Sequence, residues 1–161
     1  MLDLQQGRHP PVHTIVDLTE IPEMKLLEIR DEGLFIGAGV ALSRIARNTL
    51  VASHAQALVE ASDLVGGPQV RNMATIGGNL CNGVPSADSA TPLLALNAVV
   101  TIEGRDGSRH IALEDFFLGP GCVALAHHEV LTAITVTRTF MAVAVELGQE
   151  GLKRKKWLLG A

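Results

Sequence analysis

The chain has 161 residues, the length of one ordinary domain, and 47% of them are hydrophobic against only 3% aromatic, so its core must consist of aliphatic side chains. A formal net charge of −4 argues against a nucleic-acid-binding surface, which usually has a basic face. Because the sequence has no uncharged apolar run of about 18 residues and no secretory leader pattern, we expect neither a membrane span nor export.

Short strands are predicted near the start of the chain. Residues 1–11 are polar and end in two prolines, which indicates a loop, whereas the β-branched residues of 12–18 indicate a strand. Residues 25–30 and 34–40 are two further strand candidates. The turn signal at 31–33 between them predicts a hairpin.

Two helices are expected next. A helical pattern begins near Ala41, and a stronger one runs from about Ser53 to Val65, with Ser53 as its N-cap. The sequence Gly66-Gly67-Pro68 ends this second helix. Residues 66–92 contain many glycines and are predicted to be irregular.

The second half of the chain reads mostly as strands. A short helix ends near residue 96, and strand patterns follow at 99–103, 110–113, 123–125 and 130–136. The Asp106-Gly107 pair between the first two is a hairpin signal. Strands mixed with a few helices, without regular alternation, predict an α+β domain with a mixed or antiparallel sheet. The tail from Thr139 has a helical pattern with poor capping. Its pattern is not connected to that of the preceding strands.

Residues 66–97 are the most informative part of the chain, and the segment Ala74–Asn79, with the sequence ATIGGN, lies within them. Two adjacent glycines allow positive φ and close approach of a ligand, and their N–H groups can converge on an anion. Thr75 and Asn79 add a hydroxyl and an amide. The pattern is neither a Walker loop nor the GxGxxG of dinucleotide-binding folds. The pattern suits a pyrophosphate, but an isolated glycine pair is more often an ordinary tight turn, so the residues around it decide between the two.

Polar residues continue beyond the glycines. Asn79, Asn82, Ser86 and Asp88 lie close together in the sequence, and residues 86–89 read as a helix N-terminus rich in capping residues. Polar groups in a buried loop need hydrogen-bond partners. A ligand with a phosphate and a ribose would supply them.

The run RNMATIGGNLCNGVPSADSATPLLALNA resembles the signature of the FAD-binding subunit of the xanthine dehydrogenase (molybdopterin dehydrogenase) family. The segments VDLTEIPEM, LFIGAGVALSRIA, FFLGPG and HEVLTAITV also occur in that family's order, so the resemblance covers about residues 12–137. It implies the PCMH-type FAD-binding fold, mainly its second subdomain, with a mixed or antiparallel sheet flanked by helices. We expect a partial domain of this type over residues 1–137 and a divergent tail over 138–161.

The resemblance implies FAD as cofactor and assigns its contacts. It places the pyrophosphate against the backbone amides of Ala74, Thr75, Ile76, Gly77, Gly78 and Asn79. Asp88 is implied to bind ribitol or ribose hydroxyls, Val65 to lie near the flavin, and Val130 to pack on the adenine side. Gln69 and Arg71 either brace the loop or are surface or scaffold residues.

The implied function is that of an electron-transfer subunit. Electrons come from the 2Fe-2S clusters of a small subunit, which a molybdopterin-binding large subunit reduces, and the flavin passes them to NAD or another acceptor. No catalytic acid or base is expected, because the cofactor carries the chemistry. The family's first glycine loop, of the type AGGTDL, and its C-terminal domain have no counterpart here. The alternatives are therefore a remnant that keeps the fold without binding FAD, or another flavoenzyme of the same fold.

The cysteines and histidines give no further site. Cys81 and Cys122 are too widely spaced for a metal clip or a disulfide framework, which favours a reducing, cytoplasmic setting. Cys81 is expected to be a packing residue rather than a redox or covalent flavin site. His127, His128 and Glu129 are interpreted as a turn or surface feature, so no metal ligands are predicted.

Overall fold

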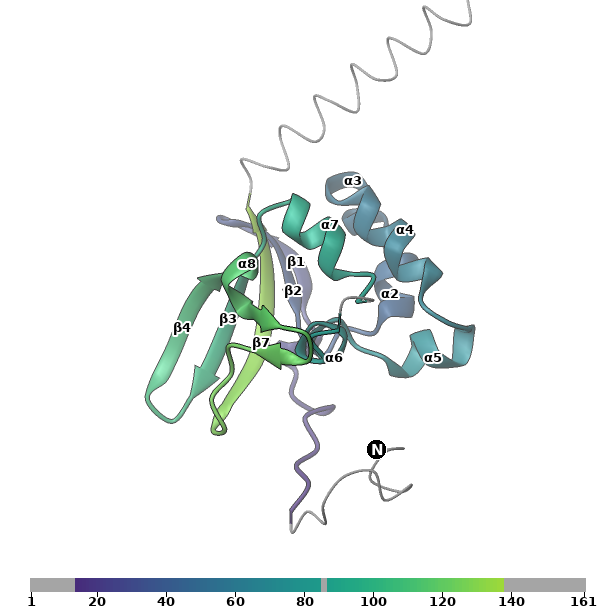
Figure 1. Cartoon of the computed structure of the whole chain (residues 1–161). Coiled ribbons are helices and arrows are strands. Elements are labelled where there is room, and N and C mark those ends of the chain that lie inside the picture. Colours follow the sequence, from purple (N-terminus) through teal and green to yellow (C-terminus); the bar gives the residue numbers. More distant parts are fainter. Residues whose placement is uncertain (1–13, 85–86, 138–161) are drawn as a thin grey trace, which may run out of the picture.

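Helices cover one face of a five-stranded antiparallel sheet in the computed structural model, which describes residues 14–84 and 87–137 (Figure 1). The strand order is β1-β2-β7-β3-β4, and every neighbouring pair is antiparallel. This confirms the predicted α+β class. The five strands are Leu27–Arg30 (β1), Gly33–Gly37 (β2), Val99–Gly104 (β3), Gly107–Ala112 (β4) and Glu129–Thr137 (β7).

Two hairpins build the outer parts of the sheet, and both were predicted. β1 and β2 turn at Asp31-Glu32, and β3 and β4 turn at Arg105-Asp106. Gly107 has a φ of +116°, a conformation that side chains rarely adopt, which explains the Asp-Gly signal. β7 lies between the two hairpins and pairs with β2 on one side and with β3 on the other.

The core lies between the sheet and the helices α2 (Leu42–Ala46), α3 (Thr49–His54), α4 (Gln56–Leu64) and α7 (Ala90–Ala95). It is almost wholly aliphatic, as the composition predicted, and Phe116 is the one aromatic side chain among the fully buried residues of the described ranges. The largest aliphatic members are Leu34, Ile36, Leu42, Ile45, Leu58, Ile76, Leu80, Leu93, Ile102, Leu113 and Ile134.

The strand predicted at 12–18 is wrong over the residues that the structure describes. Residues 14–18 form no strand, and the side chains of Ile15 and Val16 are 60% and 72% exposed. A β-branched run becomes a strand only when a neighbour pairs with it, which short-range sequence cannot show. The loop predicted at 1–11 and the tail 138–161 lie outside the described residues.

The helix predicted from Ser53 to Val65 is two helices. α3 starts earlier, where the Asn48 side chain accepts a hydrogen bond from Val51 N at 3.1 Å, so Asn48 is the N-cap. Ser53 lies inside α3, and its hydroxyl donates to Leu50 O. Ala55, with φ −150°, separates α3 from α4.

Residues 66–92 are more regular than predicted, because they contain two short helices. These are α5 (Pro68–Met73) and α6 (Ile76–Cys81). Pro68 stands at the start of α5, where its missing N–H is not needed. A 3-10 turn at Glu23–Lys25 lies where residues 21–24 indicate a turn, whereas the helix α8 (Leu113–Phe116) is not among the predicted helices. The strand expected at 123–125 is only β6 (Cys122–Val123), paired with β5 (Phe117–Gly119) in a separate ribbon.

Candidate functional site

The glycine pair lies in the first turn of α6 rather than in a loop. Thr75 is the N-cap, and its Oγ1 accepts a hydrogen bond from Gly78 N at 3.1 Å. Neither glycine has a positive φ, so the backbone conformation predicted for the pair is wrong. Gly77 is required by packing, since a Cβ there would lie 2.6 Å from Ala38 Cβ. Gly78 is exposed and leaves the helix surface bare.

Most amides of this segment are already bonded within the fold. Ala74 N donates to Val70 O, Ile76 N to Val40 O, and Gly77 N to Ala38 O, at 2.7, 3.0 and 2.9 Å. The consecutive free N–H groups expected of an anion nest are therefore not present. Gly78 N is held only by the Thr75 hydroxyl, which can rotate, so this N–H can be released to another acceptor.

A buried hydrogen bond brings the segment after residue 86 against α6. Ser89, which is fully buried, donates from Oγ to Asn79 Oδ1 at 2.6 Å and from its backbone N to the same oxygen at 3.4 Å. Asp88 is the next residue toward the N-terminus, and it is exposed. The structure thus brings Asp88 and the glycine pair to one region.

Val65 ends α4 at a turn that Arg71 braces. The Arg71 guanidinium donates to the carbonyl oxygens of Val65 and Gly66 at 3.3 and 2.7 Å, and lies 3.5 Å from the Asp63 carboxylate. Gly66 has a φ of +47°, so the turn needs this glycine. Arg71 is thus a scaffold residue of this turn and does not brace the glycine pair.

Val130 lies apart from the other predicted residues, on the face of the sheet that the helices leave open. It lines a hollow of about 920 Å³ together with Phe35, Thr101, Thr132 and Thr135. No residue of 74–79 lines this hollow. β7 has an irregularity beside Val130: Leu131 pairs with Ile102 and Ala133 with Thr101, so Thr132 is an extra residue between them.

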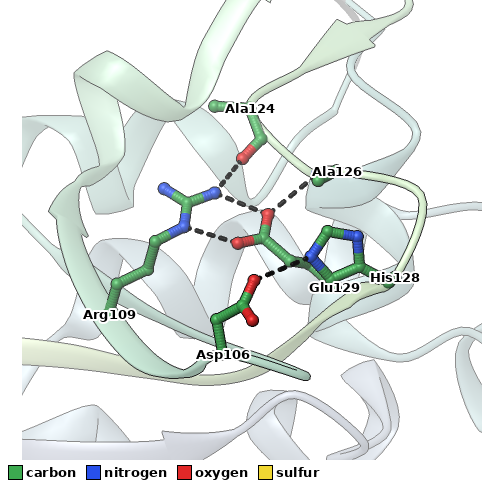
Figure 2. A network of polar contacts seen from close by, with 6 residues as sticks. All are labelled: Asp106, Arg109, Ala124, Ala126, His128 and Glu129. Carbon is green, nitrogen blue, oxygen red and sulfur yellow. Dashed lines mark hydrogen bonds and ion pairs between the residues drawn. The ribbon is translucent and has the colours of Figure 1, made fainter.

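A polar network holds the start of β7, as Figure 2 shows. Arg109 on β4 donates from Nε and Nη2 to the two carboxylate oxygens of Glu129, at 2.8 and 2.7 Å, and from Nη2 to Ala124 O at 2.6 Å. Ala126 N also donates to Glu129. The hydrogen bonds from Arg109, and then the one from Ala126, lower the pKa of Glu129 to about 2. Sequence reasoning missed this network, because residues 20 positions apart give no local pattern.

The cysteines and histidines lie as packing and surface residues. Cys81 packs partly buried on the core, and this burial raises the pKa of its thiol to about 11, which disfavours the reactive thiolate. His127 and His128 are exposed in the turn before β7. Across residues 14–84 and 87–137, no three His, Cys, Asp or Glu side chains are grouped as a metal site would require. Within the same residues, no helix has the length and apolarity needed to cross a bilayer.

Comparisons with known proteins agree on one family. The profile of the family described as "FAD binding domain in molybdopterin dehydrogenase" matches residues 1–138. The xanthine dehydrogenase FAD-binding subunit of Escherichia coli O157:H7 is 39% identical over 120 residues, which are 74% of this chain and 41% of that protein. The carbon monoxide dehydrogenase medium chain of Hydrogenophaga pseudoflava is 32% identical over 157 residues, covering 96% of this chain and 53% of the relative.

Solved structures show the same fold. Carbon monoxide dehydrogenase from Hydrogenophaga pseudoflava superimposes with a TM-score of 0.73 at 32% identity, over 75% of this chain and 42% of the matched chain. Quinoline 2-oxidoreductase from Pseudomonas putida 86 superimposes with a TM-score of 0.72 at 26% identity, over the same shares. The chain therefore spans about half the length of the curated relatives it matches, or less.

Proposed function

Because the chain belongs to the family of FAD-binding domains in molybdopterin dehydrogenases, we propose that it is the FAD-binding part of an electron-transfer subunit in a molybdenum hydroxylase of the xanthine dehydrogenase type. The observation that supports this most directly is the hydrogen bond between Asn79 and Ser89, which joins the glycine helix α6 to the segment that contains Asp88. These are the two parts of the family motif to which the cofactor contacts were assigned.

The residues present fit a pyrophosphate, at a narrower contact than the sequence indicated. Gly78 exposes bare backbone at the start of α6, and its N–H can leave the Thr75 hydroxyl for a phosphate oxygen. Ala74, Ile76 and Gly77 then act indirectly, since their bonded amides fix the position of the turn. Asn79 holds the segment of Asp88, whose carboxylate would accept hydrogen bonds from sugar hydroxyls.

The two outer contacts are proposed for the ends of the cofactor. Val65 would pack near the flavin ring, on a turn that Arg71 keeps in shape. Val130 would pack on the adenine side, at the start of β7. The bound flavin would supply the redox chemistry, and the protein positions it and excludes water. This division of labour needs no acid or base from the chain.

We propose further that electrons enter from the 2Fe-2S clusters of a small subunit, which a molybdopterin-binding large subunit reduces, and leave to NAD or another acceptor. Support comes from the relatives, which are named FAD-binding subunits and medium chains and so are parts of larger enzymes. A chain of the same fold that binds no FAD is the second candidate. The observation in its favour is that few amides of α6 remain free.

A titration of the purified chain with FAD separates the two candidates. Binding is read by quenching of flavin fluorescence and by calorimetry, for the natural chain and for Gly78→Leu. Leucine is a good helix former but would cover the bare backbone, so we expect the Kd for FAD to rise more than about tenfold while the helix is retained. Ala57→Leu, at an exposed position of α4, is the matched control.

Each outcome decides between the candidates. Saturable binding that Gly78→Leu weakens and Ala57→Leu leaves unchanged supports the FAD-binding function. A folded natural chain that shows no binding at millimolar FAD supports the second candidate. Equal loss of affinity in both leucine variants would mean that binding does not involve the start of α6.

A further inference from the structure

We propose that Arg109 and Glu129 are positioning residues that hold Val130 in place for the adenine end of FAD, an inference that rests on the function proposed above. Glu129 directly precedes Val130 at the start of β7, and Arg109 reaches it from β4, across the intervening strand β3 (Figure 2). Side chains alternate between the faces of a strand, so the Glu129 carboxylate and the Val130 side chain point to opposite faces. The hydrogen-bonded pair of Arg109 and Glu129, called the clamp below, can therefore act on Val130 without occupying the surface that a ligand would use.

The clamp matters for Val130 because the pairing of β7 with β3 is irregular two residues further along β7. Residues 129–131 pair only with β3, because β2 pairs with residues 133–137 of β7, and the unmatched Thr132 separates the two stretches. Bulges of this kind re-aim neighbouring side chains. On the other side of Val130, the turn of residues 126–129 leads out of the sheet. Val130 is therefore held by its pairing with Glu103 on one side and, along the chain, by the hydrogen-bonded Glu129.

Both carboxylate oxygens of Glu129 accept hydrogen bonds. Its two oxygens take the planar fork of Arg109, and Oε2 also accepts from Ala126 N at 2.8 Å. Its own backbone N donates back to Ala126 O at 3.0 Å, which closes the turn in both directions. Arg109 adds the bond to Ala124 O, so a single guanidinium connects β4, the loop before β7, and β7 itself. Bidentate charged pairs of this kind fix geometry as well as adding energy.

The neighbouring strand leaves room for the clamp. Gly104 pairs with Glu129 across the sheet, and a Cβ at Gly104 would lie 2.9 Å from Glu129 Cγ. Gly104 does not have a positive φ, so its conformation alone does not call for glycine. Glycine is needed at this position because it leaves space for the Glu129 side chain. His128 and Asp106, whose side chains approach to 3.7 Å at the edge of the network, are both largely exposed and contribute little.

The test uses ligands that carry one end of FAD each. FMN lacks the adenine end, and ADP lacks the flavin, so calorimetric Kd values for FAD, FMN and ADP report on the two ends separately. The variants are Glu129→Gln, which keeps the shape of the side chain, and Arg109→Lys, which keeps the charge but loses the fork. Glu28→Gln is the matched control, because it breaks the Glu28–Arg30 pair of 2.8 Å on the edge strand β1.

We expect Glu129→Gln and Arg109→Lys to raise the Kd for FAD and for ADP about tenfold, to leave the Kd for FMN unchanged, and to shift the Val130 amide signal in NMR spectra. Glu28→Gln should change none of these. Equal weakening of FAD and FMN, or unchanged ADP binding by the folded variants, would overturn the positioning role while leaving the FAD-binding function intact. Absence of FAD binding by the natural chain would overturn the function itself, and the positioning role with it.

Discussion

At the scale of single residues, Glu129 shows how much a partly accessible carboxylate can be altered by its hydrogen bonds. The Arg109 fork and the Ala126 N–H both favour its charged form, and together they lower its pKa from 4.5 to about 2. A carboxyl whose pKa is lower in the folded chain than in the unfolded one stabilises the fold above the unfolded pKa. That stabilisation is lost as the pH falls through the interval from 4.5 to about 2.

Glu129→Gln should therefore destabilise the chain at neutral pH more than at acid pH. Urea unfolding of the natural chain and of Glu129→Gln at pH 7, and again below pH 3, measures the gap in the free energy of unfolding. We expect the gap to shrink as the pH falls, because protonation removes from the natural chain what the substitution removes at every pH. A gap that stays constant would show that the carboxylate charge contributes nothing, and Glu28→Gln gives the background for an exposed pair.

At the scale of elements, α6 is seated on the chain segment that follows β2. Gly77 N donates to Ala38 O, and the bare Cα of Gly77 lets the helix approach Ala38 closely. Ala38 N donates in turn to Thr132 O on β7. The glycine helix is thereby connected to the central strand, which fixes the proposed pyrophosphate contact relative to the sheet.

Gly77→Ala should disrupt this contact between α6 and Ala38. The added methyl would lie 2.6 Å from Ala38 Cβ and 2.9 Å from Ala38 O, so α6 would have to move. We expect a loss of about 1–3 kcal/mol in the free energy of unfolding, as for other overpacked sites. Gly119→Ala is the control, because nothing lies within 4 Å of the added methyl and its φ is not positive. Its effect should stay within about 0.5 kcal/mol. Equal stability of the two variants in urea titrations would show that α6 does not need the close approach of Gly77 to Ala38.

Elements whose signal is local were predictable from the sequence. The hairpin at Asp106-Gly107 was found because the turn chemistry is contained in the turn itself. The strand predicted at 12–18 was wrong over residues 14–18, because a strand depends on a distant partner. α6 was missed because two adjacent glycines are poor helix formers, and only the Thr75 cap and the contact with Ala38 make the helical turn favourable there.

The candidate site followed the same rule. The motif residues of 74–79 and Asp88 are close in sequence, and the resemblance located them before any contact was known. The actual use of their amides depends on Val40 and Ala38, which lie more than thirty positions earlier in the chain. The Arg109–Glu129 clamp has no short-range signal at all. The hydrogen-bond partners of the motif residues therefore could not be predicted from the motif alone.

At the scale of the whole molecule, β7 is the element on which the described part of the chain depends. It pairs with β2 from the first hairpin and with β3 from the second, and its buried residues Leu131, Ile134 and Val136 face the helices. The pairing of residues 33–37 with 133–137 joins segments about a hundred positions apart. Without β7, the two hairpins would share no strand.

Native-state hydrogen exchange should reveal this hierarchy. Amides of β7 and β3 open only when the sheet separates, so they should exchange slowest, near the global unfolding limit. α5 should exchange fastest among the described helices, because it has six residues and none of them is buried. Arg71 ties the preceding turn to α5, so Arg71→Ala should speed exchange in α5 and leave β7 unchanged. Equal protection of α5 and β7 in the natural chain would contradict this hierarchy. It would mean that α5 unfolds only together with the sheet, and that the turn at Val65 is as stable as the core.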